Sequence, residues 1–381
     1  GAIETGDLAK LSSSQLQALS AKQVQAFSTA QLNGLSTTQI QSFTAKQVAG
    51  FSTAQVASLS TDNVKALTST QVKGLTADQL KAMTSGQIAV LDTEDIAVLT
   101  DKQIKGISTG NIVALTTGQA SVLTDKQLKA FSADQIKAIE TEDLAQLGTN
   151  AIKGLSATQI GALTSGQVTA FTTAQAAALS YAQIAGLTTA NIKGLEAVDL
   201  EKISTAAIKG LQATAVGGIS TDAIAKLSSS HISAFSDAQV KAFTTDQAGK
   251  LTSAQAAGLT AANIKGLETA DLAQLSTDAI AGLSASSISA FSADQVKAFT
   301  AAQAEKLTSA QVAGLTATNI KGLETADMVK ITDTAIKGLT TAAIQALDNK
   351  GNVTASQITA LKTAYTTTQL SGWGFTTDQL A

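Results

Sequence analysis

Residues 19–26 read LSAKQVQA, and this eight-residue unit recurs along almost the whole chain. A large apolar residue, here termed the anchor, occupies every eighth position from Ile3 to Leu347, which makes 44 anchors without a gap. A second apolar residue follows five positions after each anchor, as Val24 follows Leu19. Alanine weakens this second series at Ala120, Ala176, Ala248, Ala256 and Ala304. A fixed period over nine-tenths of the 381 residues indicates a repeat array rather than an ordinary globular domain.

The polar positions of the octad predict the start of a helix. Counting from the anchor, position 2 is mostly Ser or Thr and position 5 is usually Gln, as in Ser20 and Gln23. Ser or Thr followed three residues later by Gln is a capping box, and the apolar residues that flank it form a hydrophobic staple. Glycine at position 8, as in Gly74 and Gly106, is typical of the residue that takes the chain out of a helix.

Two other structures do not fit the spacing. In one continuous helix, eight residues advance about 800°, so the anchors would drift by about 80° per octad and bury no common face. A strand requires alternation with period 2, which this pattern lacks. We therefore expect an all-α solenoid of very short capped helices, one per eight-residue repeat. Such helices are far shorter than the roughly 12 residues that a free helix needs, so they must stack to be stable.

A longer repeat lies above the octad. Segments 227–282 and 283–338 are identical at 39 of 56 positions, and NIKGLE recurs at 191–196, 263–268 and 319–324. A block of seven octads is either one superhelical turn or the length of a duplication. The register slips after Leu347. We therefore divide the chain into an octad-repeat solenoid over 1–347 and a C-terminal cap or subunit junction over 348–381.

Composition and motifs argue against several functions. The chain has no cysteine, a net charge of −3 and dispersed lysines, so we expect no disulfide and no nucleic-acid partner. No run of apolar residues is long enough for a transmembrane segment. His231 is the single histidine and stands where Gln is usual, so it is most simply a substituted capping residue; a catalytic or metal role would need partners that the sequence does not identify. We expect no enzyme activity, cofactor or metal.

The two chain ends carry the candidate assembly residues. Ile3 and Leu8 would expose an apolar N-terminal end, since repeat arrays need polar caps to remain monomeric. Trp373, Phe375 and Leu380 would supply an apolar face at the other end. Contact between these unlike faces predicts head-to-tail homo-oligomers. The alternatives are that the aromatic tail folds back over its own end, and that Trp373 and Phe375 form a small cap core rather than an exposed partner site.

Runs such as FTTAQ at 171–175 and AIETEDL at 138–144 resemble the octad repeats, L-[ST]-x-x-Q-[IVL]-x-[AG], of long bacterial secreted and cell-surface proteins. The resemblance covers residues 3–347 and implies an extracellular or cell-surface protein with a structural or adhesive role and possible contact with the cell surface. Our leading hypothesis is a structural subunit of a bacterial filament, sheath or surface layer that self-assembles through the ends or faces of the solenoid. The alternative is a stalk or spacer region of a cell-surface adhesin.

Overall fold

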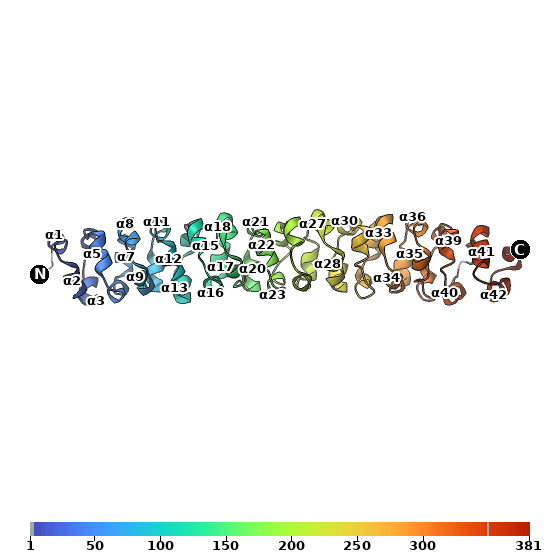
Figure 1. Ribbon diagram of the computed structural model, residues 1–381, viewed down its shortest axis with the longest axis horizontal. Coiled ribbons are helices and arrows are strands. Elements are labelled where there is room, and N and C mark those ends of the chain that lie inside the picture. The colour runs from blue at the N-terminus through green and yellow to red at the C-terminus, as the bar shows by residue number, and fades with distance from the viewer. Residues whose placement is uncertain (1–3, 349) are drawn as a thin grey trace. The chain divides into compact units, whose positions relative to one another are not determined.

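The computed structural model describes residues 4–348 and 350–381, in two compact units that span residues 1–186 and 187–381. In each unit, short helices follow one another along the chain (Figure 1), and the described residues contain no strand. The α-helices have four to eight residues, and most of them pack against the helices three octads before and after them. The predicted all-α solenoid of very short helices is thus confirmed.

The helices of the first unit are α1 (Thr5–Leu8), α2 (Ser13–Gln17), α3 (Ala21–Gln25), α4 (Thr29–Asn33), α5 (Thr37–Ser42), α6 (Ala45–Ala49), α7 (Thr53–Ser58), α8 (Thr61–Lys65), α9 (Ser69–Gly74), α10 (Ala77–Ala82), α11 (Ser85–Ala89), α12 (Thr93–Ala97), α13 (Asp101–Gly106), α14 (Thr109–Val113), α15 (Thr117–Ser121), α16 (Asp125–Ala130), α17 (Ala133–Lys137), α18 (Thr141–Gln146), α19 (Thr149–Ile152), α20 (Ala157–Ala162), α21 (Ser165–Thr169), α22 (Thr173–Ala177) and α23 (Tyr181–Ile184).

The second unit also contains short 3-10 helices, labelled η, three of which lie in the NIKGLE segments. Its helices are η1 (Ile192–Gly194), α24 (Ala197–Leu200), α25 (Thr205–Ile208), α26 (Ala213–Val216), α27 (Thr221–Lys226), α28 (Ser229–Ala234), α29 (Asp237–Lys241), α30 (Thr245–Gly249), α31 (Ser253–Ala256), η2 (Ile264–Gly266), α32 (Thr269–Gln274), α33 (Thr277–Gly282), α34 (Ala285–Ser289), α35 (Ala293–Lys297), α36 (Ala301–Glu305), α37 (Ser309–Val312), η3 (Ile320–Gly322), α38 (Thr325–Met328), α39 (Asp333–Ile336), α40 (Thr341–Ala346), η4 (Lys350–Asn352), α41 (Ala355–Lys362), α42 (Thr367–Gly372) and α43 (Thr377–Leu380).

The octad at 131–138 shows why each helix starts and stops. The Ser132 hydroxyl accepts a hydrogen bond from the Gln135 backbone N–H (3.2 Å), and the Gln135 Oε1 accepts one from the Ser132 N–H (2.8 Å), which completes the predicted capping box. Phe131 and Ser132 both have extended backbones, with φ/ψ of −62°/142° and −72°/163°. Two extended residues per octad therefore end one helix and redirect the chain into the next.

The two apolar series form the core of each unit. Residues at position 6 are almost fully enclosed, and anchors are buried from Leu35 onward; Ile136 is 1% exposed and Ile139 is 4% exposed. The anchor N–H also bonds to the carbonyl three residues earlier, as Ile139 does to Ile136 at 3.2 Å. Each octad thus places two apolar side chains inside while its cap and position 7 remain at the surface.

Glutamine side chains join successive turns of the solenoid. The Gln135 Nε2 donates to the carbonyls of Ile104 (3.0 Å) and Ile107 (2.7 Å), which lie 31 and 28 residues earlier. The second unit repeats this geometry, since the Gln311 Nε2 donates to residues 31 and 28 positions earlier at 2.6 and 2.8 Å. A spacing of 28 residues is three and a half octads. The 56-residue block therefore spans two such spacings, and its interpretation as one superhelical turn is wrong.

Glycine at position 8 has a different role from the one expected. Gly374 is the one glycine among the described residues with a positive φ (98°), so the position-8 glycines do not end helices in a left-handed conformation. Instead, a Cβ on Gly74 would lie 2.7 Å from the carbonyl oxygen of Ala45, 29 residues earlier, and Gly106 faces Ala77 in the same way. Glycine is needed there because the backbones of two turns approach closely.

Candidate functional site

Position 5 of the octad is the most informative polar site, because its side chain reaches both its own helix start and the preceding turn. We call it the slot. Gln fills it in most octads, and the other occupants fall into a few types. They are Asn63, Asn111, Asn191, Asn263 and Asn319; Asp7, Asp95, Asp143, Asp199, Asp271 and Asp327; His231; Ser287; and Ala151, Ala207, Ala215, Ala223, Ala279, Ala335 and Ala343.

Shorter donors in the slot still reach the preceding turn. The Asn111 Nδ2 donates to the carbonyl of Met83 at 2.8 Å, and the Ser287 Oγ donates to the carbonyl of Leu259 at 2.5 Å, in each case 28 residues earlier. A hydrogen-bond donor in the slot can therefore reach a backbone carbonyl of the preceding turn over a range of side-chain lengths.

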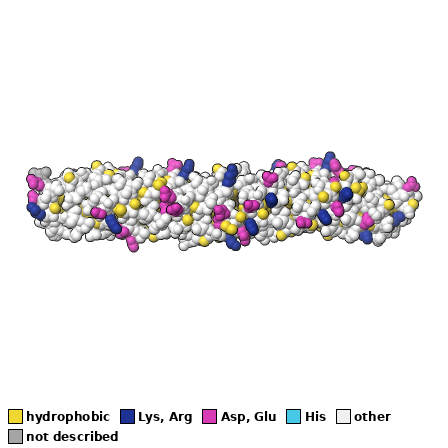
Figure 2. All heavy atoms as spheres, turned by 90° about the horizontal axis from the view of Figure 1, so that it is seen from above, with side chains coloured by type: hydrophobic (Ala, Val, Ile, Leu, Met, Phe, Trp, Pro, Cys, Tyr) yellow, Lys and Arg dark blue, Asp and Glu magenta, His cyan; other side chains and the backbone are white. Residues whose placement is uncertain are grey.

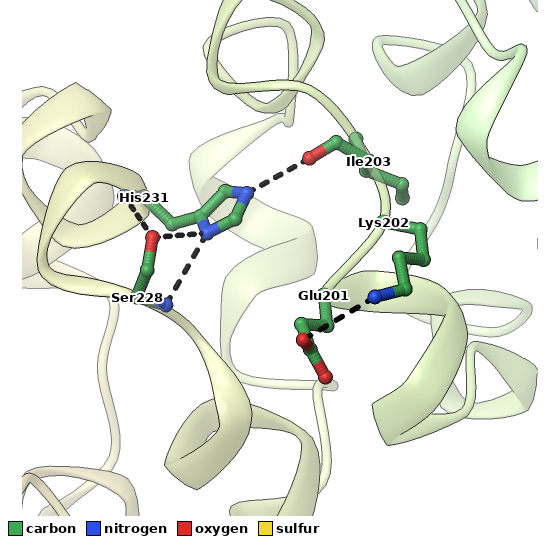
Figure 3. Close-up of polar contacts among 5 residues, drawn as sticks. All are labelled: Glu201, Lys202, Ile203, Ser228 and His231. Atoms are coloured by element: carbon green, nitrogen blue, oxygen red, sulfur yellow. Dashed lines mark hydrogen bonds and ion pairs between the residues drawn. The ribbon is translucent and has the colours of Figure 1, made fainter.

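His231 is a capping residue, as predicted. Its Nδ1 lies 3.2 Å from the Ser228 nitrogen and 2.7 Å from the Ser228 hydroxyl, while its Nε2 lies 2.8 Å from the carbonyl of Ile203 (Figure 3). These contacts fit the tautomer with its proton on Nε2, which donates to Ile203 while Nδ1 accepts from Ser228. The imidazole thus keeps the contacts of the usual glutamine with its own helix start and with the carbonyl 28 residues earlier. The nearby Glu201–Lys202 ion pair is a separate surface contact.

Aspartate in the slot has no donor of its own when ionised. Asp143 and Asp271 are each 3% exposed, and the Oδ2 atom of each is buried without a hydrogen-bond partner. Burial raises the pKa of Asp143 to about 6, with a further contribution from the negative charges of Glu140 and Glu142. Burial and Glu268 raise the pKa of Asp271 to about 6 in the same way. Burial, with a further contribution from the negative charge of Glu324, also raises the pKa of Asp327 to about 6.

Asp95 is the exception among these buried carboxyls. Its Oδ1 accepts from the Ser69 hydroxyl at 2.8 Å, and its Oδ2 accepts from the Asp92 N–H at 3.2 Å. Burial still raises its pKa, but the two hydrogen bonds oppose that rise. Asp7, in the first octad, is exposed and pairs with Lys10 at 3.1 Å.

The assembly candidates are mostly packed inside the chain. Ile3 lies outside the described residues. Leu8 is 0% exposed, and Phe375 and Leu380 are also buried. Trp373 is half-buried, with its ring edge-on to Tyr365 at a centroid distance of 5.0 Å.

Side chains of the tail also satisfy carbonyls of the last turns. The Gln357 Nε2 donates to the carbonyl of Ile331 (2.6 Å), the Tyr365 hydroxyl to that of Leu339 (2.5 Å) and the Lys350 ammonium to that of Leu347 (2.5 Å). Tyr365 thus takes over the glutamine role where the octad register is lost, because its bond spans 26 residues, whereas the Lys350 bond spans only three. The aromatic residues of the tail are visible in the sequence, but residue spacing does not predict the donor roles of Tyr365 and Lys350.

The first turn is more open. Gln15 and Gln23 are exposed, and the anchors Leu11, Leu19 and Phe27 are only half-buried. These residues have no described residue 28 positions earlier to cover them.

The described residues form shallow grooves at the surface. One of about 680 Å³ is lined by Lys265 and Glu268, and another of about 610 Å³ by Lys321 and Glu324, 56 residues later. Charged side chains are scattered over the face in Figure 2 and form no large patch of one sign there. Within the part of the chain that the structure describes, no three His, Cys, Asp or Glu residues are grouped to hold a metal, and no helix is long and apolar enough to cross a membrane.

Comparison with known proteins identifies the repeat. The ALTTAQ repeat family matches seven overlapping or separate segments that together cover just over half of the chain: residues 1–37, 29–61, 49–77, 60–93, 88–125, 136–173 and 264–301. No curated protein matches the sequence. The chain therefore belongs to the ALTTAQ repeat family.

Proposed function

We propose that this chain is a structural spacer of a bacterial cell-surface or secreted protein and has no catalytic activity of its own. The observation that carries the proposal is the use of the slot. Gln47, Gln135 and Gln311 each direct the amide nitrogen to carbonyls of the preceding turn and the amide oxygen to their own helix start. The recurring polar groups are thereby engaged in holding turns together.

The packing of the tail favours a spacer over a self-assembling subunit. Phe375 and Leu380 are buried, and the carbonyls of Leu339 and Leu347 already accept bonds from the tail. A head-to-tail contact would need these groups at a free surface. The proposed location outside the cell is supported by the resemblance to octad repeats of surface proteins.

A filament, sheath or layer subunit is the second candidate, because the first turn favours it. Gln15 and Gln23 are exposed donors, and Leu11 and Leu19 are half-exposed apolar groups. A partner surface with free carbonyls and apolar side chains would complement them.

Sedimentation velocity of the full chain over a wide range of concentrations separates the two candidates. A monomer at every concentration supports the spacer, whereas species that grow with concentration support a filament or layer. In the second case, Leu11→Gln with Leu19→Gln should abolish growth if the ends associate. Tyr181→Ser with Val198→Ser, at exposed lateral positions, should abolish it if faces associate. Protease treatment of intact cells tests the surface location, since an intracellular chain would be spared.

A further inference from the structure

Aspartate and asparagine occupy the same position of the octad, the slot, in different repeats. The Asn263 Nδ2 donates to the carbonyls of Ile232 (2.9 Å) and Phe235 (3.1 Å), 31 and 28 residues earlier. Aspartate has the same length as asparagine but an oxygen in place of the NH₂ group. At the slot of Asp143, the residues at these two spacings are Ile112 and Leu115.

An ionised aspartate is a poor match for this environment. The Asp143 Oδ2 is buried without a partner, and the Leu115 carbonyl accepts no hydrogen bond from any described residue. The same holds for the Asp271 Oδ2 and the Phe243 carbonyl. A carboxylate only accepts hydrogen bonds, whereas a protonated carboxyl group has one O–H to donate. One proton on each carboxyl would therefore satisfy both unpaired groups.

We propose that Asp143 and Asp271 are proton-dependent joints of the solenoid: in the folded chain each carboxyl carries a proton and donates it to the anchor carbonyl one turn earlier, Leu115 or Phe243. When the pH rises, the proton leaves for solvent, the bond breaks, and a carboxylate is left against a carbonyl oxygen. Contact between these turns is then weaker at neutral pH than at acidic pH.

The sequence contains an independent sign of this arrangement. Every octad with Asp in the slot also has an acidic residue at position 2, in place of the usual Ser or Thr. The pairs are Glu4/Asp7, Asp92/Asp95, Glu140/Asp143, Glu196/Asp199, Glu268/Asp271 and Glu324/Asp327. Glu140 and Glu268 make no side-chain cap hydrogen bond. Their negative charge instead favours the protonated form of the aspartate, because a second like charge nearby is costly.

Few other charges face these carboxyls. Helix α18, which follows Glu140 and carries Glu142 and Asp143, packs against α15 and α21, and neither of these helices has a charged residue. Helix α32 packs against α30 and α35, whose charged residues are Asp246, Asp294 and Lys297. Those three side chains are exposed to solvent, where their effect on a buried group is screened.

Thermal unfolding of the full chain from about pH 4 to about pH 8 tests the proposal. We expect the Tm of the natural chain to fall by several degrees between about pH 4, where aspartate ionises in the unfolded chain, and about pH 6, where the two aspartates lose their protons in the folded chain. Asp143→Asn with Asp271→Asn places a donor in both slots at every pH and should remove most of that fall. The control, Asp134→Asn with Asp222→Asn, removes two exposed carboxyls and should keep it.

Two further measurements keep the proposal open to refutation. Glu140→Gln with Glu268→Gln removes a neighbouring negative charge from each aspartate and should lower its pKa, so the fall in Tm should become smaller and should end at a lower pH. An unchanged pH profile in the Asn variant would overturn the proposal. Recovery of the neutral-pH Tm on adding calcium or magnesium chloride, lost in the Asn variant, would overturn it in favour of a bound cation.

Discussion

Two consecutive octads, 131–138 and 139–146, share one frame but differ in the slot. Both place a position-6 residue, Ile136 or Leu144, in the core at 1% exposure. Gln135 bonds to its own helix start and to two carbonyls of the preceding turn, whereas Asp143 has an unpaired buried oxygen. The fold therefore depends on the apolar series, and the slot sets how strongly a turn is joined to the one before.

A deletion that breaks the eight-residue register should have the largest effect on stability. Removing residues 135–138 shifts every later anchor by half an octad, so anchors meet slots and the first unit loses cooperative unfolding. Removing the whole octad 131–138 keeps every later residue in register and should leave a helical, cooperatively melting chain. The two octads inserted at 211–226 are a natural example of such a change. Circular dichroism melts compare the two deletions, and equal damage would refute the octad as the structural unit.

Charged substitutions in the core should be nearly as severe in both octads. Ile136→Asp and Leu144→Asp each bury an unpaired carboxylate, and we expect a loss of about 3–5 kcal/mol of unfolding free energy in either case. Lys137→Ala, at an exposed position, should change stability by less than about 0.5 kcal/mol. Denaturant titrations measure these values. A much milder effect at Leu144 would mean that the acidic octad is not part of the common core.

Alanine substitutions in the slot should change stability differently in the two octads. Gln135→Ala removes bonds at both ends of the amide and leaves buried carbonyls unpaired, which should cost about 2–3 kcal/mol. The raised pKa of Asp143, about 6, means that its contribution to stability is present below about pH 4 and is lost as the pH rises to about 6. Asp143→Ala should therefore be neutral or stabilising at pH 7 and destabilising at pH 4. Equal losses for both variants at neutral pH would contradict this difference.

Substitutions at the helix caps of the two octads should show the smallest difference in stability. The Ser132 hydroxyl accepts a hydrogen bond from Gln135, so Ser132→Ala should cost about 1 kcal/mol. Glu140 makes no cap hydrogen bond, and Glu140→Ala should change stability by less than about half of that. Chemical denaturation at neutral pH measures both. If Glu140→Ala is the more damaging change, the glutamate has a structural contact beyond its charge.

The sequence by itself determined the octad and its helix. The Ser132–Gln135 cap and the pairing of anchor with position 6 lie within eight residues, so local chemistry was enough to predict a short capped helix in each octad. The same argument identified His231 as a substituted capping residue. It did not reveal that the side chains of His231 and Gln135 also reach the preceding turn. The acidic residues that occur together at positions 2 and 5, such as Glu140 and Asp143, can be seen in the sequence, but the burial of the aspartate cannot.

Only the tertiary structure decided how the turns meet. The 28-residue spacing depends on how sharply two extended residues, such as Phe131 and Ser132, redirect each helix, and the eight-residue period does not specify that angle. That spacing brings Gly74 against Ala45 and leaves the Asp143 oxygen without a partner. Contacts within an octad can be predicted from residue spacing alone, whereas contacts between turns follow from the accumulated geometry of three and a half octads.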